Sequence, residues 1–163
     1  MADRSPMTTH GHRRLTEELQ RLKGTERRKA SEAISVARDH GDLSENAEYD
    51  AAKEAQGHLE ARIRLIESQL SAAQVIDVTK LSGTKVTFGA TVLISDCDSG
   101  EERLIMIVGE DEANVDRGLI SYLSPLARAL IGKNLDDLVK VRLPVGEKEY
   151  EIREVRYEER NEA

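Results

Sequence analysis

Apolar residues recur every three or four positions along the first half of the chain. In the segment from Thr8 to His40 they are Leu15, Leu19, Leu22, Ala30, Ala33 and Ala37. In the segment from Ser44 to Ala73 they are Ala52, Ala55, Leu59, Ile63, Ile66, Leu70 and Ala73. This spacing follows the helical period, with one interruption near Glu26, and it predicts two helices that each carry a narrow apolar seam of the coiled-coil type.

The two seams match each other when the second helix is folded back antiparallel on the first. In an antiparallel hairpin, the residue numbers of two facing residues add up to a constant. With such a constant sum, apolar residues of the first helix face apolar residues of the second, except that Glu26 faces Leu59. The apolar pairs are Leu15 with Leu70, Leu19 with Ile66, Leu22 with Ile63, Ala30 with Ala55, and Ala33 with Ala52. The pairing is centred between Asp42 and Leu43, which predicts a hairpin that bends there. Because the seam residues shrink toward the bend, we expect a slim rod of roughly 45 Å, too narrow to hold a small-molecule pocket.

After Ala73 the pattern changes to that of short strands. Five runs are β-branched, largely alternating and bounded by turn residues. They are VIDV, KVTFGATVLIS, ERLIMIVGE, LVKVRLP and KEYEIREVRY. A short helix is predicted within SPLARALIGK, because Ser124 can cap it, Pro125 suits its first turn and Gly132 follows its end. The chain is therefore expected to be α+β, with a small, mainly antiparallel sheet packed on one helix.

Composition narrows the class of protein further. Apolar residues make up 39% of the chain, with one Phe and no Trp, so the core must be mainly aliphatic. A net charge of −7 disfavours general coating of nucleic acid, which depends on excess Lys and Arg. The lone Cys97 can form no internal disulfide, and the sequence has no signal-peptide pattern and no apolar run of membrane-spanning length. We expect a cytoplasmic protein without a membrane partner.

The chemistry of interest lies at the predicted bend, within ARDHGDLSENAEYDAAKE. Asp42 and Glu45 are three positions apart, and such carboxylates suit Mg²⁺, which takes one or two protein carboxylates and completes its shell with water and phosphate. This pair alone would bind the ion weakly, so further ligands would have to come from a partner. A structural alternative is a capping box formed by Asp42 and Glu45 at the start of the second helix. Likewise, Asn46 and Tyr49 could contact nucleotide groups or be ordinary helix residues.

The stretch HGDLSENAEYDAAKEAQG resembles the tip signature of the bacterial Gre transcript-cleavage factors, GreA type. The likeness extends to PMTTHGHRRLTEELQRLK, AQVIDVTKLSG, FGATV and SPLARALIGK, and it runs from about Pro6 to Arg156. It implies an N-terminal antiparallel coiled-coil hairpin domain, 1–75, that enters the secondary channel of RNA polymerase. It also implies an FKBP-like domain, 80–158, that docks at the channel rim. The last residues, 159–163, are expected to form a disordered tail.

The same resemblance assigns roles to individual residues. Asp42 and Glu45 become the tip acids, which would hold a Mg²⁺ ion shared with RNA polymerase and not bound stably by the factor alone. The expected contacts to polymerase, or to the RNA 3′ end of a backtracked complex, are Arg38, Asn46, Tyr49 and Lys53. Polymerase docking is expected at Ser124, Pro125 and Leu126. In this interpretation the chain is a monomer and not itself an enzyme: it stimulates the cleavage of backtracked RNA that the polymerase performs.

Some positions depart from the family pattern. At Arg28–Ser31 a proline and bulkier aliphatic residues are expected, Asp50 stands where His is usual, and Lys53 stands where Arg is usual. A second hypothesis is therefore a paralogue that plugs the channel and inhibits the polymerase. A third hypothesis, from a different class of function, is a coiled-coil adaptor or holdase, or a prolyl isomerase. An isomerase would need an aromatic-lined pocket, and the second half offers only Phe88, Tyr122, Tyr150 and Tyr157.

Overall fold

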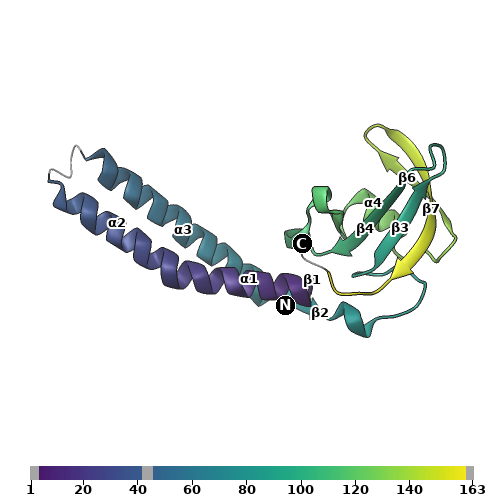
Figure 1. Ribbon diagram of the computed structural model, residues 1–163, viewed down its shortest axis with the longest axis horizontal. Helices are drawn as coiled ribbons and strands as arrows, with labels where there is room; N and C mark the ends of the chain where they lie inside the picture. Colours follow the sequence, from purple (N-terminus) through teal and green to yellow (C-terminus); the bar gives the residue numbers. More distant parts are fainter. Residues whose placement is uncertain (1–3, 42–45, 161–163) are drawn as a thin grey trace. The chain divides into compact units, whose positions relative to one another are not determined.

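The structure, a computed structural model, describes residues 4–41 and 46–160. These residues form two compact units. The hairpin unit comprises Arg13–Ala72, and the sheet unit comprises residues 4–12 together with 73–160. The fold class is α+β, as predicted (Figure 1).

The hairpin unit is built from two antiparallel helical arms that run side by side (Figure 1). The first arm consists of α1 (Thr9–Arg21), a π-helical turn (Leu22–Glu26) and α2 (Arg27–Asp39). The second arm is α3 (Ala47–Ala72). Leu22, Ile63 and Ile66 are buried between the arms, and Leu15, Leu19, Leu59 and Leu70 pack against them. This half of the predicted seam is confirmed.

Beyond Leu22 the first arm departs from the predicted seam. The buried residues of α2 are Ile34 and Ala37, whereas Ala33 and Ala55, which the constant-sum pairing placed in the seam, are exposed. The cause is the π-helical turn, which accommodates one extra residue per turn. After this turn, the residues of the first arm that face α3 are Arg27, Ala30, Ile34 and Ala37. The residues of α3 that face them are Tyr49, Ala52 and Gln56. Between the π-helical turn and the bend, the pairing of residues across the two arms is therefore shifted by one residue from the predicted constant-sum pairing.

An ion pair between the arms lies next to Glu26 and Leu59, the one mismatched pair of the predicted seam. The guanidinium of Arg27 donates two hydrogen bonds to the carboxylate of Glu60, each at 2.9 Å. This pairing lowers the pKa of Glu60 and raises that of Arg27. Glu26 points elsewhere and lies 3.5 Å from Arg21 and 3.8 Å from Lys29. The interruption in the apolar pattern is therefore bridged by a bidentate ion pair between the arms.

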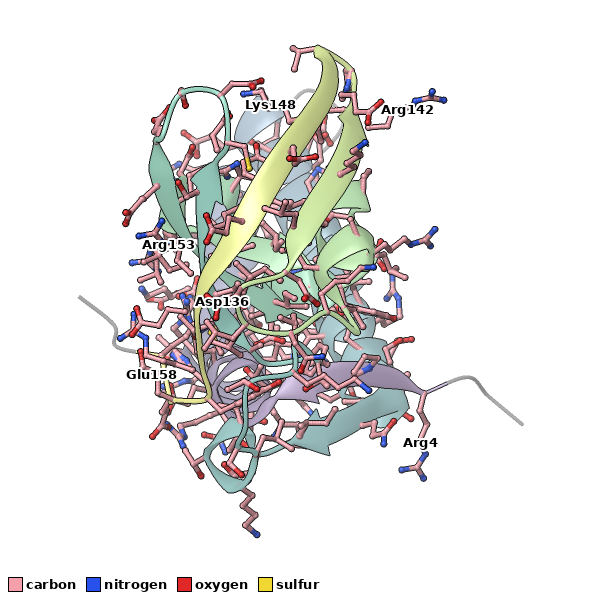
Figure 2. The ribbon with its side chains drawn as sticks, turned by 90° about the vertical axis from the view of Figure 1, so that its right-hand side faces the viewer. Arg4, Asp136, Arg142, Lys148, Arg153 and Glu158 are labelled. Atoms are coloured by element: carbon pink, nitrogen blue, oxygen red, sulfur yellow. The ribbon has the colours of Figure 1, made fainter. Side chains whose placement is uncertain are left out.

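The sheet unit contains a five-stranded sheet in the order β5-β4-β3-β7-β6 (Figure 1). All neighbours are antiparallel except β4 and β5, which are parallel. The strands are β3 (Thr91–Asp96), β4 (Glu102–Val108), β5 (Leu119–Ser121), β6 (Leu138–Leu143) and β7 (Gly146–Arg156). Figure 2 shows Arg142 and Lys148 at the turn end of the β6–β7 hairpin.

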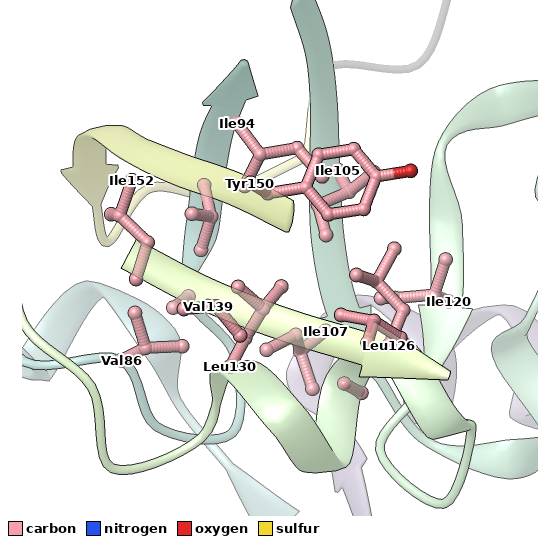
Figure 3. Close-up of a cluster of buried hydrophobic side chains, with 14 residues drawn as sticks. Val86, Ile94, Ile105, Ile107, Ile120, Leu126, Leu130, Val139, Tyr150 and Ile152 are labelled. Atoms are coloured by element: carbon pink, nitrogen blue, oxygen red, sulfur yellow. The ribbon is translucent and has the colours of Figure 1, made fainter. Parts of the chain in front are cut away.

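The main core lies between one face of this sheet and α4 (Pro125–Leu130). Leu126, Ala127 and Leu130 of α4 are buried against aliphatic residues of the strands (Figure 3). The strand residues of this core include Ile94, Ile105, Ile107, Val139 and Ile152. The predicted helix is confirmed, with Ser124 as its cap, because the amide of Ala127 donates to Ser124 Oγ at 3.3 Å.

The four aromatic residues considered for an isomerase pocket are used in packing. Tyr150 is buried in the main core, and Phe88, Tyr122 and Tyr157 pack against it. The rings of Phe88 and Tyr122 meet edge to face, with centroids 5.9 Å apart. The hydroxyl of Tyr157 bonds to Lys85 O and lies 2.8 Å from Thr87 Oγ1.

Two strands were missed by the sequence analysis, and one expected strand is shorter than predicted. β5 was missed, and so was β1 (Ser5–Thr8), which pairs in parallel with β2 (Ala73–Ile76). This pairing places residues 4–12 and 73–75 in the sheet unit, although the sequence assigned them to the hairpin. The run expected as a strand over 85–95 becomes regular only at Thr91, because Gly89 turns the backbone with φ +88°.

A buried carboxylate fastens β1 and the first turn of α1 within the sheet unit. The side chain of Glu112 is 3% exposed and accepts hydrogen bonds from the amides of Thr8 (3.1 Å) and Gly109 (2.8 Å) and from the Thr8 hydroxyl. Thr8 in turn caps α1, because the Gly11 amide donates to its hydroxyl oxygen at 3.1 Å. A Cβ at Gly11 would overlap the Glu112 carboxylate. Glycine is therefore required at position 11 by this close approach.

The C-terminal segment reaches the same cluster. The Arg160 guanidinium lies 3.8 Å from Glu112 and 3.1 Å from His10 Nδ1. The predicted disorder of 159–163 stays a prediction for 161–163, which lie outside the described residues.

Deleting Gly24 tests whether the π-helical turn Leu22–Glu26 accommodates one inserted residue while the apolar side chains of the first arm keep facing α3. Without Gly24, the residues now at Leu22, Arg27, Ala30, Ile34 and Ala37 fall into an uninterrupted three-four repeat. The same side chains then face α3 in a regular α-helix, so we expect the melting temperature of the hairpin to stay within a few degrees of the parent. Deleting Gly57 is the matched control, because it rotates one part of α3 against the other by about 100°. That deletion should lower the melting temperature strongly, as measured by circular dichroism at 222 nm. Equal losses in both variants would contradict the role assigned to the π-turn.

Replacing Glu112 by Gln should loosen the N-terminal strand. The amide cannot accept every hydrogen bond that the carboxylate accepts, so buried donors lose their partner at a cost of roughly 1–3 kcal/mol. Hydrogen exchange of the Thr8 amide should accelerate accordingly. Glu110→Gln, an exposed substitution in the same turn, should leave that exchange rate unchanged.

Candidate functional site

The first arm ends at a glycine whose backbone conformation requires that residue type. α2 finishes at Asp39, and the amides of His40 and Gly41 donate to Ala37 O (3.2 Å) and Arg38 O (3.4 Å). Gly41 has φ +114°, a conformation that side chains with a Cβ rarely adopt. An added Cβ would meet no atom within 4 Å, so the requirement is conformational and not steric. The glycine therefore marks the chain's exit from α2.

Asn46 ties the ends of the two arms together. Its side-chain oxygen accepts a hydrogen bond from the Tyr49 amide at 3.1 Å, which makes Asn46 the N-cap of α3. Its side-chain nitrogen donates to the Ala37 carbonyl in the last turns of α2 at 2.6 Å. One half-buried amide thus satisfies a free donor of one helix and an acceptor of the other. These two hydrogen bonds therefore join the end of α2 to the start of α3, the two helix ends that flank residues 42–45 in the sequence.

The predicted acidic pair, Asp42 and Glu45, lies outside the described residues. What is described is the helix that follows: α3 begins at Ala47, and the capping bond at its start comes from Asn46. The alternative of a capping box formed by Asp42 and Glu45 likewise falls outside the described residues and stays a prediction. The cap was missed by the sequence analysis, although an Asn directly before a segment with Glu48 and Asp50 in its first turn is a recognised signal.

Two other acids near the bend, Glu48 and Asp50, have structural roles. Glu48 and Asp50 lie in the first turn of α3, where negative charge interacts favourably with the helix dipole. Glu48 also lies 3.8 Å from His40 Nε2 across the bend. Part of the negative charge in this region is thus explained by helix electrostatics alone. Asp50, which departs from the family pattern, is one of these residues.

The four predicted contact residues all lie in the turns next to the bend. Arg38 is in the last turn of α2 and is exposed, as is Lys53 in α3. Tyr49 and Asn46 are half-buried, and Asn46 is engaged in the cap described above. The arrangement therefore leaves two exposed cations, one on each arm, in the turns that precede and follow 42–45.

The comparisons with known proteins cover almost the whole chain. Residues 5–75 match the family model described as "Transcription elongation factor, N-terminal", and residues 81–157 match "Transcription elongation factor, GreA/GreB, C-term". The chain belongs to the GreA/GreB family of transcription elongation factors.

Individual relatives of this family are similar over nearly their full length. The chain is 58% identical over 153 residues to a transcription elongation factor GreA of Alkalilimnicola ehrlichii, covering 93% of this chain and 97% of the relative. It is 55% identical over 156 residues to a GreA of Anaeromyxobacter sp., covering 96% and 94%. Among solved structures, the factor Gfh1 of Thermus thermophilus matches with 28% identity and a TM-score of 0.43, covering 94% of this chain and 99% of that one.

The residues expected to dock a GreA/GreB factor on polymerase lie around the start of α4. Ser124 is engaged within the chain, since its hydroxyl donates to Ser121 O at 2.7 Å as well as accepting from Ala127. Leu126 belongs to the main core and is 8% exposed. Pro125 is exposed. Docking at these residues stays a prediction, and Pro125 offers the exposed surface among them.

The described residues contain neither a metal-ligand cluster nor a membrane-spanning helix. Within 4–41 and 46–160 no three His, Cys, Asp or Glu side chains are grouped closely enough to hold a metal ion. No helix in these ranges has both the length and the apolar character needed to cross a membrane.

Asn46→Ala should fray the start of α3 and loosen the base of the bend. Loss of an N-cap costs about 1 kcal/mol, and the contact to Ala37 is lost in addition. Hydrogen exchange at the Tyr49 amide should speed up about fivefold or more. Asn46→Asp is the informative comparison, because it keeps the capping acceptor and removes only the donor to Ala37. It should protect the Tyr49 amide nearly as well as Asn46; if it protects no better than alanine, the cap assignment is wrong.

Proposed function

We propose that this chain stimulates RNA polymerase to cleave backtracked RNA by inserting the end of its helical hairpin into the polymerase's secondary channel. The observation that carries the proposal is the construction of the hairpin unit. Its two arms are packed on a narrow seam, and their ends, joined by Asn46, bracket the acidic sequence 42–45. Membership of the GreA/GreB family of transcription elongation factors supports polymerase as the partner.

The narrowness of the hairpin explains why the reaction has to belong to a partner. In the described part of the arms the seam consists mainly of Leu, Ile and Ala side chains and is bridged by the Arg27–Glu60 ion pair, so it packs the arms together and does not enclose a substrate. The two arms can, however, carry a pair of charged groups into a site that is reached only through a channel. The chain is thus a factor that completes the catalytic centre of another protein, and the polymerase breaks the phosphodiester bond.

Asp42 and Glu45 would hold a Mg²⁺ ion together with groups of the polymerase. The donor set fits this ion, since carboxylates are hard oxygen ligands and Mg²⁺ accepts one or two of them beside phosphate and water. Bound there, the ion would stabilise charge on the oxygens of the phosphodiester and lower the pKa of a bound water. The chain's own part is to bring the two carboxylates to the RNA 3′ end.

Arg38 and Lys53 would contribute attraction for the RNA. Both are exposed, and they belong to opposite arms next to the bend. Cations in this position offset the repulsion between the acidic segment and the phosphate backbone, and the attraction should weaken with added salt. Lys53 supplies a point charge without the bidentate geometry of Arg.

The deciding experiment is RNA cleavage in purified, backtracked elongation complexes. The parent protein should produce short 3′ RNA fragments in a Mg²⁺-dependent reaction. Asp42→Ala and Glu45→Ala should each slow the cleavage by roughly 100-fold, because each removes a group that stabilises developing charge. Asp39→Ala removes the same charge from an exposed position at the end of α2 and should retain most of the activity.

Two outcomes would contradict the proposal. If both tip variants cleave as well as the parent while circular dichroism shows intact helices, the roles given to Asp42 and Glu45 are wrong. If the parent protein instead suppresses synthesis by complexes that are not backtracked, the chain is a channel-blocking inhibitor.

A further inference from the structure

The sheet unit contains a cavity that the proposed function does not use. It has a volume of about 320 Å³ and lies between β4, the turn that leads into β5 and the C-terminal segment 158–160. Glu158 marks this region and lies at the opposite end of the sheet from Arg142 and Lys148 (Figure 2). None of the residues that line the cavity belongs to the bend or to the predicted docking residues at the start of α4.

The floor of the cavity is apolar. It includes Leu104, Met106 and Leu119. Because side chains alternate along a strand, Leu104 and Met106 face away from the main core, into which Ile105 and Ile107 point. Met106 and Leu119 are almost fully buried, whereas Leu104 is 50% exposed. The cavity is therefore open to solvent on the side of Leu104.

The wall beside this floor is held rigidly in place. Gly118 has φ +75°, its amide donates to Val115 O at 3.0 Å, and its carbonyl accepts from the Met106 amide at 2.8 Å. A Cβ at Gly118 would lie 2.7 Å from Leu104 O, so only glycine permits this approach. The turn that carries Arg117 is thus fixed against β4.

The charges around the cavity leave one cation to offer a ligand. Glu158 lies 3.4 Å from Arg156, and Arg160 interacts with Glu112 and His10. Glu159, the second carboxylate that lines the cavity, also has an interaction within the chain. Arg117 is exposed at the rim, and no carboxylate in the part of the chain that the structure describes forms an ion pair with it. The site therefore combines an apolar floor with a guanidinium that is free to bind a carboxylate in bidentate fashion.

We propose that this cavity is a docking site for a protein segment that places one large apolar side chain on the floor and an adjacent carboxylate against Arg117. Its openness to solvent on the side of Leu104 favours a side chain over a free small molecule, because pockets for such molecules enclose most of their ligand. A single anchoring side chain in a pocket, with the remainder of the partner outside it, is the usual construction of an interface hot spot. This site stands independently of the cleavage function.

The test is an NMR titration of the full chain, labelled in its methyl groups and amides, with two matched peptides. The probes are N-acetyl-Trp-Glu-amide and N-acetyl-Trp-Gln-amide. Since the chain contains no Trp, the indole signals report on the peptide alone. Saturable shifts are expected for the methyl groups of Leu104, Met106 and Leu119, with dissociation constants on the order of millimolar for such small probes. The Glu peptide should bind about three- to tenfold more tightly than the Gln peptide.

Two variants make the result decisive. Arg117→Gln should abolish the preference for the Glu peptide while leaving the Gln peptide's affinity unchanged. Arg103→Gln removes an exposed cation from β4 outside the cavity and should preserve the preference. Shifts that do not saturate, shifts centred elsewhere, or a Glu preference that survives in Arg117→Gln would each overturn the proposal.

Discussion

The hairpin depends on keeping one apolar stripe of its first arm turned toward α3 along the whole length of that arm. Leu22 and Ile34 are both buried against the second arm, although an uninterrupted α-helix would not hold the residues of α2 in phase with those of α1. The π-helical turn Leu22–Glu26 resolves this conflict by taking up one residue on the solvent side. Burial of the apolar stripe thus outweighs the weaker hydrogen-bond geometry of a π-turn.

At the end of the hairpin nearest the bend, polar contacts hold the two arms together. Near the bend, the buried contacts become small, and Ala37 is the last buried residue of α2. Gly41 ends one helix, Asn46 starts the other, and the Asn46 side chain connects the two through Ala37. The two points between which the acidic sequence 42–45 runs are therefore fixed by backbone conformation and two hydrogen bonds.

The sheet unit contains two close approaches that depend on glycine. Glu112 fits against the first turn of α1 only because position 11 is glycine, and the rim of the cavity beside β4 exists only because position 118 is glycine. In the first case the approach secures a buried carboxylate among three donors. In the second it holds Arg117 beside an apolar floor. Both features couple segments that are far apart in the sequence.

The sequence by itself determined the elements whose signals are local. The helical period, the antiparallel match of the arms as far as Leu22, the end of the first arm near Gly41 and the short helix capped by Ser124 all follow from spacing and from turn or cap residues. The tip residues were proposed from a resemblance, and Asp42 and Glu45 stay a prediction. Only the tertiary structure decided the phase of α2, because a single missing apolar position is equally compatible with a mismatch or with an inserted residue. It alone assigned the capping role to Asn46, and it alone revealed β1, β5 and the burial of Glu112. These depend on partners distant in the chain, and a pattern of neighbouring residues carries no record of them.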